Sequence, residues 1–420
     1  MKGRSGERGS RRTADPRRST TVKTGARTGN LPTLIACFMH FDLSFMLWVL
    51  IGSLGVFASQ DLGLSPAQKG WLVAVPILSG SILRIPLGLL SDRVGGRRAG
   101  IALLAFLFVP LVLGWLWADS FSSLLAAGFL LGAGGASFAV ALPLASRWYP
   151  PERQGLAMGI AAAGNSGTVV TNLLAPRLAA IVGWHGVFGL AMIPLAVVLL
   201  AFVLLAREDS SRSLVAPASG TRQLLRAPDL WWFCAFYAVT FGGYVGLSSF
   251  LPIFFRDQYQ VTPLQAGYLT AAAALAGSVA RPIGGIVADR VGGVRLLSIV
   301  LVVVAGAYGL AARLPPLGAM VGILVAGMLG LGMGNGAVFQ VVPQRFRRQV
   351  GAATGIIGAL GGLGGFALPT LLGTLKQTSG SFGSGFLALS VAAVSAVVAL
   401  RVLVGAREQW PAAAEVPEIT

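Results

Sequence analysis

Apolar runs of about twenty residues recur along the chain between residues 31 and 405. An α-helix of that length, at roughly 1.5 Å per residue, crosses the hydrocarbon layer of a membrane. Strands of a membrane barrel would instead alternate apolar and polar residues at every second position. The composition agrees, because 55% of the 420 residues are hydrophobic, 11% are charged and the mean hydropathy is +0.76. We therefore predict an all-α membrane protein and exclude an ordinary soluble domain.

Charged residues, Gly and Pro divide these runs into twelve predicted membrane helices. The first six lie near 32–59, 69–91, 99–118, 122–146, 155–182 and 187–206. The second six lie near 230–256, 264–288, 295–314, 317–342, 351–376 and 383–404. The predicted organisation is a disordered basic tail (1–30), an N-terminal six-helix half (31–206), a linker (207–229), a C-terminal six-helix half (230–405) and a C-terminal tail (406–420).

The basic residues predict the orientation of the chain in the membrane. The net charge is +17, yet no separate basic domain carries it, so binding of nucleic acid is not expected. The two tails, the linker and the segments on their side of the predicted helices hold 25 of the 32 Lys and Arg, and the opposite segments hold five. Because cytoplasmic segments are enriched in Lys and Arg, both termini are predicted to be cytoplasmic, in a multi-pass protein of the cell (inner) membrane.

An internal repeat relates the two halves. The stretch SGSILRIPLGLLSDRVGGRR, at 79–98, returns 197 residues later as GSVARPIGGIVADRVGGVR, at 277–295, so that Arg84 corresponds to Arg281. GNSG at 164–167 and GGLG at 361–364 have the same offset. Two parallel halves related by an axis along the membrane normal are the arrangement of the major facilitator superfamily. The repeated G-x-x-x-D-R-x-G-G turn resembles that superfamily's loop signature, so the resemblance implies twelve helices in two pseudo-symmetric six-helix halves.

Arg84 and Arg281 are the charges that most need an explanation. An arginine at the centre of a membrane helix costs about 2.5–3.5 kcal/mol on insertion scales. Each lies about eight residues, or ~12 Å, inside its predicted helix, which is too deep for comfortable snorkelling to the surface. No acidic residue repeats beside them as a counter-ion. We therefore predict an anion site in which two planar guanidinium groups face each other across the interface between the halves.

Stretches rich in small residues accompany the arginines, at 132–143, 161–167, 332–343 and 358–365. Small residues allow helices to pack closely in lipid, and this explains most of these glycines. Asn165 in AAAGNSG does not fit that explanation, because an amide on a small-residue helix face needs a hydrogen-bond partner. We therefore predict that Asn165 contacts the ligand.

A closer resemblance covers nearly the whole chain after residue 30. GNSG near 164 and GALGGLGGFALP at 358–369, with one arginine in each of the second and eighth predicted helices, resemble the nitrate/nitrite porter family. The departure from the family pattern is Ala161 and Ala162, where glycines are common. The resemblance implies an anion clamp of Arg84 and Arg281, hydrogen bonds from Asn165 and Tyr237, and bordering rings of Phe138 and Phe241. A planar anion without a proton can only accept hydrogen bonds. It therefore suits this set of side chains, because Arg, Asn and Tyr supply donors.

His40 and Asp42 form a polar pair in the first predicted helix, in the sequence FMHFDLSF. One interpretation makes Asp42 a proton carrier, since burial favours the protonated carboxyl while a nearby arginine favours the ionised one. The other makes it a structural group that caps a helix break or pairs with an arginine. His40 is likewise either a packing residue or a second proton-coupling group.

The two repeated turns are predicted gates. Asp92 and Arg93 in the first turn, with Asp289 and Arg290 in the second, are expected to latch the cytoplasmic ends of the two halves in one state of a transport cycle.

The function predicted is nitrate and nitrite transport by alternating access, as proton-coupled nitrate import or as nitrate/nitrite exchange. An exchanger of another small or organic anion is the alternative within transport, and an anion receptor is the alternative outside it. An enzyme is not expected, because no metal-ligand cluster or nucleophile–base pair is found in the sequence. The expected partners are nitrate, nitrite, protons and membrane lipid, with no cofactor and no metal, and the protein is expected to be a monomer.

Overall fold

A computed structural model describes residues 29–149, 160–161, 163–208, 221–346 and 349–406. The predicted tails lie almost wholly outside these residues, as does 209–220 of the predicted linker. The N-terminal half contains α1 (Leu31–Trp48), α2 (Leu50–Asp61), α3 (Pro66–Val94), α4 (Gly96–Leu116), α5 (Phe121–Leu131), η1 (Gly132–Ala136), α6 (Phe138–Ser146), η2 (Ala163–Ser166) and α8 (Gly167–Leu205).

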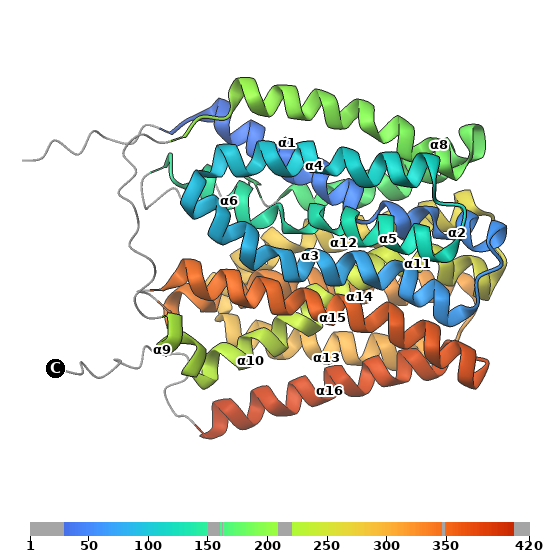
Figure 1. Cartoon of the computed structure of the whole chain (residues 1–420). Coiled ribbons are helices and arrows are strands. Elements are labelled where there is room, and N and C mark those ends of the chain that lie inside the picture. Colours follow the sequence, from blue (N-terminus) through green and yellow to red (C-terminus); the bar gives the residue numbers. More distant parts are fainter. Residues whose placement is uncertain (1–28, 150–159, 162, 209–220, 347–348, 407–420) are drawn as a thin grey trace, which may run out of the picture.

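The C-terminal half is built in the same way and lies beside the first (Figure 1). It contains α10 (Pro228–Tyr237), η3 (Ala238–Gly242), α11 (Gly243–Tyr259), α12 (Pro263–Val291), α13 (Gly293–Ala311), α14 (Leu317–Arg345), α15 (Val350–Ser379) and α16 (Gly383–Ala406). A short helix, α9 (Thr221–Arg226), precedes it. The linker was predicted to reach residue 229, and the structure places α9 and the first two residues of α10 inside that range.

Eleven helical spans in the described part of the chain are long and apolar enough to cross a membrane. The longest, Ala163–Leu205, is interrupted at Gly183, whose φ of 73° is not helical. Glycine adopts such a φ without the steric cost that a Cβ imposes, so the span divides there into two crossings. The predicted break between residues 182 and 187 falls at this glycine. The fold is therefore that of an all-α membrane protein, consistent with twelve helices.

The internal repeat is visible in the helix ends. Ser65 and Gln68 form a capping box at the start of α3, and Thr262 and Gln265 form another at the start of α12. These boxes, each with a proline in the first turn, begin the helices before the predicted starts at 69 and 264. At the other ends of α3 and α12, Gly95 (φ 98°) and Gly292 (φ 90°) make the repeated turns. We call the end that contains these two turns and α9 the tail end, and the opposite end the loop end.

Several predicted continuous helices are interrupted. The first breaks at Val49 between α1 and α2. The fourth contains the 3₁₀ turn η1, whose sequence GAGGA has no large side chain to favour α-helical packing. The seventh contains a π-helical turn, η3, directly after Tyr237. Such local departures from α-helix are often found at functional sites and are not visible in hydrophobic periodicity.

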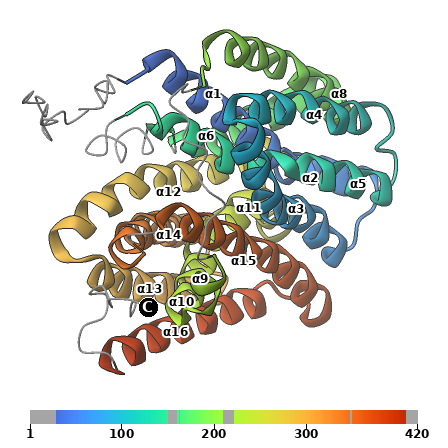
Figure 2. The same ribbon diagram turned by 60° about the vertical axis from the view of Figure 1, so that its left-hand side comes forward.

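The two halves meet along three helix pairs. α3 packs along α15, α8 packs along α12, and α2 packs along α11. Figure 2 shows α3 and α15 next to each other where the halves meet. Glycines allow the closest approaches between the halves, because a Cβ at Gly70 would collide with the backbone of α15 and a Cβ at Gly362 with the side chain of Ser81 in α3. The predicted packing role of the small residues is confirmed.

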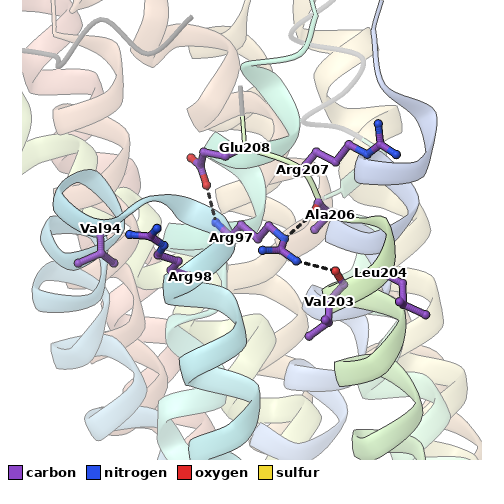
Figure 3. A pocket seen from close by; sticks show the side chains of 8 residues that line it. All are labelled: Val94, Arg97, Arg98, Val203, Leu204, Ala206, Arg207 and Glu208. Atoms are coloured by element: carbon purple, nitrogen blue, oxygen red, sulfur yellow. Dashed lines mark hydrogen bonds between the residues drawn. The ribbon is translucent and has the colours of Figure 1, made fainter. Parts of the chain in front are cut away.

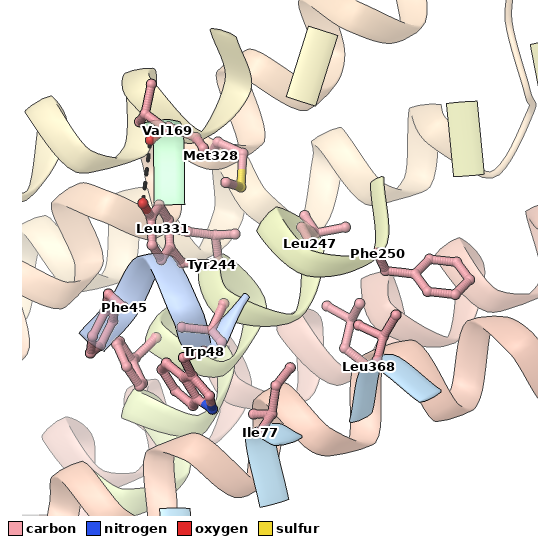
Figure 4. Close-up of a cluster of buried hydrophobic side chains, with 14 of the residues drawn as sticks. Phe45, Trp48, Ile77, Val169, Tyr244, Leu247, Phe250, Met328, Leu331 and Leu368 are labelled. Atoms are coloured by element: carbon pink, nitrogen blue, oxygen red, sulfur yellow. Dashed lines mark hydrogen bonds between the residues drawn. The ribbon is translucent and has the colours of Figure 1, made fainter. Parts of the chain in front are cut away.

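Large apolar side chains fill the centre of the molecule where the two halves meet. Trp48 and Ile77 from the N-terminal half lie in one cluster with Tyr244 and Leu368 from the C-terminal half (Figure 4). Trp48 also donates a hydrogen bond from Nε1 to the carbonyl of Pro76, at 2.8 Å, which joins α1 to α3. This buried cluster lies between the loop end and the residues described next.

Candidate functional site

Arg84 lies at the centre of the interface between the halves. It is 4% exposed, and its Nε donates to the carbonyl of Gly135, at 3.0 Å. Its Nη1 donates across the interface to the carbonyl of Gly358, while Nη2 has no partner among the described residues. Aromatic rings surround its guanidinium carbon at 5.5 Å, 5.6 Å and 4.9 Å from the ring centroids of Trp48, Phe138 and Phe241. The rings exclude water and stabilise the cation through their faces.

Arg281 approaches the same place from the other half. Its Nη2 donates to the hydroxyl of Tyr237, at 3.4 Å. Arg84 lies within electrostatic reach of both Arg281 and Tyr237. None of the ion pairs in the described part of the chain involves either arginine. The structure thus brings together two guanidinium groups from equivalent positions, with no carboxylate paired to them.

Aromatic side chains form the wall next to the arginines. The rings of Tyr237, which directly precedes η3, and of Phe241, which lies in it, are parallel with centroids 4.9 Å apart. Phe339 packs on Tyr237 at 4.7 Å and on Phe138 at 6.5 Å, so it joins the wall from α14. Phe339 was not predicted. A signal existed in the sequence, since each of the related stretches 132–143 and 332–343 contains one phenylalanine, Phe138 in the first and Phe339 in the second.

Asn165 lies in η2, the turn that leads into α8. It is 3% exposed, and its Oδ1 has no hydrogen-bond partner among the described residues. η2 packs against α12, the helix that carries Arg281. The predicted contact residues Arg84, Arg281, Tyr237, Phe138 and Phe241 are thus gathered at one level, and Asn165 lies on the turn that faces one of the two arginine helices.

A second buried amide, Asn335 of α14, was not predicted. It is 1% exposed, and its Oδ1 also lacks a partner in the part of the chain that the structure describes. It lies one helical turn before Phe339 and therefore on a similar face of α14. The sequence signal was the stretch GMGNGAVF, in which an amide interrupts a run of small and apolar residues.

Asp42 and His40 have separate surroundings. Asp42 Oδ1 accepts a hydrogen bond of 2.7 Å from Ser166 Oγ, at the start of α8, and no described ion pair joins it to an arginine. His40 is fully buried, with Nε2 3.3 Å from the carbonyl of Gly100 and its ring packed on Phe202. The structure therefore places Asp42 of α1 next to the turn that carries Asn165, but it does not bring His40 to the arginines.

The repeated turns are exposed at the tail end. Asp92 accepts from Arg147 Nη2 at 3.1 Å, which joins two helices of the same half. Arg93, Asp289 and Arg290 are exposed in the same region. At the loop end, an ion pair that was not predicted crosses between the halves, from Lys69 Nζ to Asp257 at 2.7 Å.

A cavity of about 510 Å³ lies outside this site, at the tail end between α4 and the end of α8. Arg97 donates from Nε and Nη2 to the carbonyls of Ala206 and Val203, each at 2.7 Å, and Glu208 accepts from the backbone at the start of α4 (Figure 3). The cavity contains none of the predicted contact residues. We interpret it as a surface depression at a junction of two helices, with no part in the anion site.

The chemistry of the central arrangement is that of a donor site. Arg84 Nη2, Arg281, the Tyr237 hydroxyl and the amide of Asn165 supply hydrogen-bond donors, and the rings supply a dry wall. A guanidinium group presents parallel donors that match the oxygens of a planar anion. No group of His, Cys, Asp and Glu suited to a metal ion occurs among the described residues. The arrangement can bind an anion, and the paired halves can expose it to either side in turn.

Comparison with known proteins agrees with this fold and this chemistry. The sequence model of the Major Facilitator Superfamily matches residues 36–369. The chain is 36% identical over 359 residues to the nitrite extrusion protein of Bacillus subtilis, covering 84% of this chain and 89% of that protein.

Two further relatives have similar names. A probable nitrate/nitrite antiporter of Thermus thermophilus is 34% identical over 388 residues, with 84% of this chain and 87% of that protein covered. A probable nitrate/nitrite transporter of Mycobacterium tuberculosis is 34% identical over 381 residues, with 88% and 95% covered.

Among solved structures, a bacterial homologue of the human lysosomal transporter Spinster has a similar fold. Its inward-facing, occupied form superposes with a TM-score of 0.67 at 21% sequence identity, covering 89% of this chain and 94% of that one. This likeness supports the arrangement of the helices alone.

Proposed function

Because the chain belongs to the major facilitator superfamily and, within it, to the nitrate/nitrite porters, we propose that it carries nitrate and nitrite across the cytoplasmic membrane. It is a transporter rather than an enzyme. The observation that carries the proposal is the pair of arginines at the interface, which come from opposite halves and have no described carboxylate partner. A bound anion would supply the missing negative charge.

In this proposal, Arg84 and Arg281 hold the anion from opposite sides. The Nη2 of Arg84, unpartnered in the described part of the chain, is directed to it, and Tyr237 and Asn165 add neutral donors. Phe138, Phe241 and Phe339 keep water out, which strengthens each hydrogen bond. A planar anion fits between flat guanidinium groups and flat rings better than a tetrahedral one does.

Transport then follows from movement of one half against the other. The described hydrogen bonds and ion pairs that cross between the halves near the loop end include Lys69 to Asp257 and Arg177 Nε to the Tyr268 hydroxyl, at 2.7 Å. The described ion pairs at the tail end, from Arg147 to Asp92 and Glu208 and from Arg345 to Asp229, each stay within one half. We infer a state closed at the loop end. The charge distribution favours a cytoplasmic position for the tail end, with both termini.

The charge of the anion determines what must accompany it. Nitrate entering a cell with a negative interior works against about 2.3 kcal/mol per 100 mV. Exchange for nitrite cancels this cost, while net import requires a cation such as a proton. Asp42 remains the candidate proton carrier, because it is an intramembrane carboxylate next to the turn of Asn165. His40 remains a sequence-based candidate, buried against α4. We propose that the transporter acts as a monomer surrounded by lipid.

Calorimetry on the purified protein in detergent tests the choice of anion. Nitrate, nitrite, acetate and sulfate are titrated separately at one ionic strength. We expect nitrate and nitrite to bind at least tenfold more tightly than the tetrahedral sulfate and the organic acetate. Tighter binding of acetate would instead support an exchanger of organic anions.

A further inference from the structure

The inference concerns Asn335, the buried amide that the proposed clamp does not use. Leaving a buried acceptor without a hydrogen bond costs about 1–3 kcal/mol. Its Oδ1 is such an acceptor among the described residues, and the side chain is 1% exposed. A side chain of similar size without polar atoms, such as leucine, would avoid this cost. The amide therefore needs an explanation other than stability.

The internal repeat identifies the counterpart of Asn335. The stretch GAGGASFAVALP at 132–143 corresponds to GMGNGAVFQVVP at 332–343, so that Asn335 occupies the position of Gly135. The packing supports this correspondence. Gly80 of α3 lies against Gly132, and Gly277 of α12, its counterpart 197 residues later, lies against Gly332. Gly135 and Asn335 thus lie at equivalent places next to the two arginine helices.

Gly135 binds the arginine of its own half, because its carbonyl accepts the hydrogen bond from Arg84 Nε at 3.0 Å. That carbonyl lies in the 3₁₀ turn η1, outside a regular α-helix. α14 is helical without interruption from Leu317 to Arg345, so carbonyls at its middle are used within the helix. At the equivalent position, a backbone acceptor is therefore replaced by a side-chain acceptor.

The backbone on either side of Asn335 packs next to Arg281 and next to the turn that follows Tyr237. The neighbouring residue Gly336 packs against the backbone carbonyl of Arg281, so the two helices touch at this level. Gly334, on the other side of Asn335, packs against Thr240 of η3, the turn that follows Tyr237. The long side chain of Arg281 makes one described hydrogen bond, to the Tyr237 hydroxyl at 3.4 Å, and its other donors are available.

We propose that Asn335 is a positioning residue for Arg281. In the anion-bound site its Oδ1 accepts a hydrogen bond from the Arg281 guanidinium group, as Gly135 does from Arg84, and so directs the remaining donors of Arg281 at the anion. This inference rests on the proposed function, because it assumes an anion between the two arginines. It also explains why an unpartnered amide is kept, since function at a site often costs stability.

The first test replaces Asn335 by leucine and measures nitrate affinity and melting temperature on the purified full-length protein. We expect Asn335→Leu to bind nitrate at least tenfold more weakly, with a melting temperature no lower than that of the wild type. Asn172→Leu is the matched control. Asn172 is also buried, but it accepts from Ser53 Oγ at 2.9 Å and donates to the carbonyls of Thr168 and Ser248, so its replacement should lower the melting temperature.

The second variant, Asn335→Asp, separates a positioning role from a packing role. Above the pKa of the introduced carboxyl, the carboxylate pairs with Arg281 and opposes the anion, so nitrate binds weakly. Below that pKa the neutral carboxyl again offers an uncharged acceptor, and nitrate affinity should recover toward the wild-type value. We therefore expect the ratio of wild-type to variant affinity to fall as the pH is lowered. A carboxyl group too far from Arg281 and the anion to act on either would not produce this dependence.

The outcomes distinguish the two proposals. If the wild type binds nitrate and Asn335→Leu binds it within twofold of the wild type, the positioning role is wrong and the proposed function stands. An affinity ratio for Asn335→Asp that does not change with pH also overturns the positioning role. If the wild type binds neither nitrate nor nitrite, the proposed function is wrong and this inference fails with it.

Discussion

At the scale of single residues, the geometry of the guanidinium group separates a shaped anion site from a merely positive one. Arg84 uses Nε and Nη1 for two backbone carbonyls, and its Nη2 has no partner among the described residues. Lysine keeps the charge but has a single nitrogen, so it cannot hold two carbonyls and an anion in one plane. The proposed site therefore depends on the planar guanidinium group of arginine and its several donor nitrogens.

We predict that Arg84→Lys and Arg281→Lys each reduce nitrate affinity at least a hundredfold while the protein stays folded. Arg177→Lys is the matched control, because Arg177 also contacts a tyrosine across the interface but lies outside the site. Calorimetry measures the affinity, and circular dichroism checks the fold. Nitrate binding by both site variants within threefold of the wild type would rule out the clamp.

We also predict how replacing Asp42 changes the coupling of transport to protons. Asparagine keeps an acceptor for Ser166 but cannot carry a proton. In proteoliposomes, Asp42→Asn should lose nitrate accumulation driven by a pH gradient and keep nitrate-for-nitrite exchange. Asp61→Asn, in which the carboxylate that accepts from Trp184 is changed at the loop end, should keep both activities. Continued pH-driven accumulation by Asp42→Asn would favour exchange as the physiological mode.

The repeated arginines could be predicted from the sequence, and several of their aromatic neighbours from the family resemblance, but the neighbours on α14 could not. An arginine repeated inside two apolar runs indicates a site wherever the helices fold. Whether Phe339 or Asn335 faces that site depends on the rotation of α14, and a helix with apolar residues on all sides gives no periodicity from which to derive it. The backbone partners of Arg84, at Gly135 and Gly358, depend on the 3₁₀ turn and on close packing between the halves.

At the scale of elements, the internal repeat explains the ends of the helices better than hydrophobicity does. The two capping boxes and the two glycine turns recur at equivalent positions, which is why α3 and α12 have equal lengths of 29 residues. The interruptions at Val49, η1 and η3 were missed because apolar runs predict where a helix crosses a membrane and not where its hydrogen bonds change. Two of these interruptions carry residues of the site.

The glycine turns give a prediction about stability. Gly292 has a φ of 90° and open space around it, so an added methyl group meets no neighbour and acts through backbone strain alone. Gly292→Ala should lower the free energy of unfolding by roughly 1–2 kcal/mol. Gly306→Ala, in the middle of α13 with open space and a helical φ, should raise it by about 0.5–1 kcal/mol. Denaturation in detergent measures the stability of both variants. Equal stabilities of the two variants would contradict the role of Gly292 in the turn.

At the scale of the whole molecule, the distribution of charge predicts orientation. A reporter enzyme that is active only outside the cytoplasm, fused after residue 410, should be inactive. The same reporter fused after Asp119, in a loop-end segment, should be active. The opposite pattern would invert the topology and, with it, the direction of the inferred state.

The central claim is that this molecule moves nitrate through a site built on two arginines. The most direct measurement is uptake of isotopically labelled nitrate into proteoliposomes that contain purified protein, with and without internal nitrite and with and without a pH gradient. We predict uptake by the wild type under at least one driving condition, and loss of uptake in Arg84→Lys under all of them. Absence of uptake by folded wild-type protein under every condition, or equal uptake by the wild type and Arg84→Lys, would contradict the account.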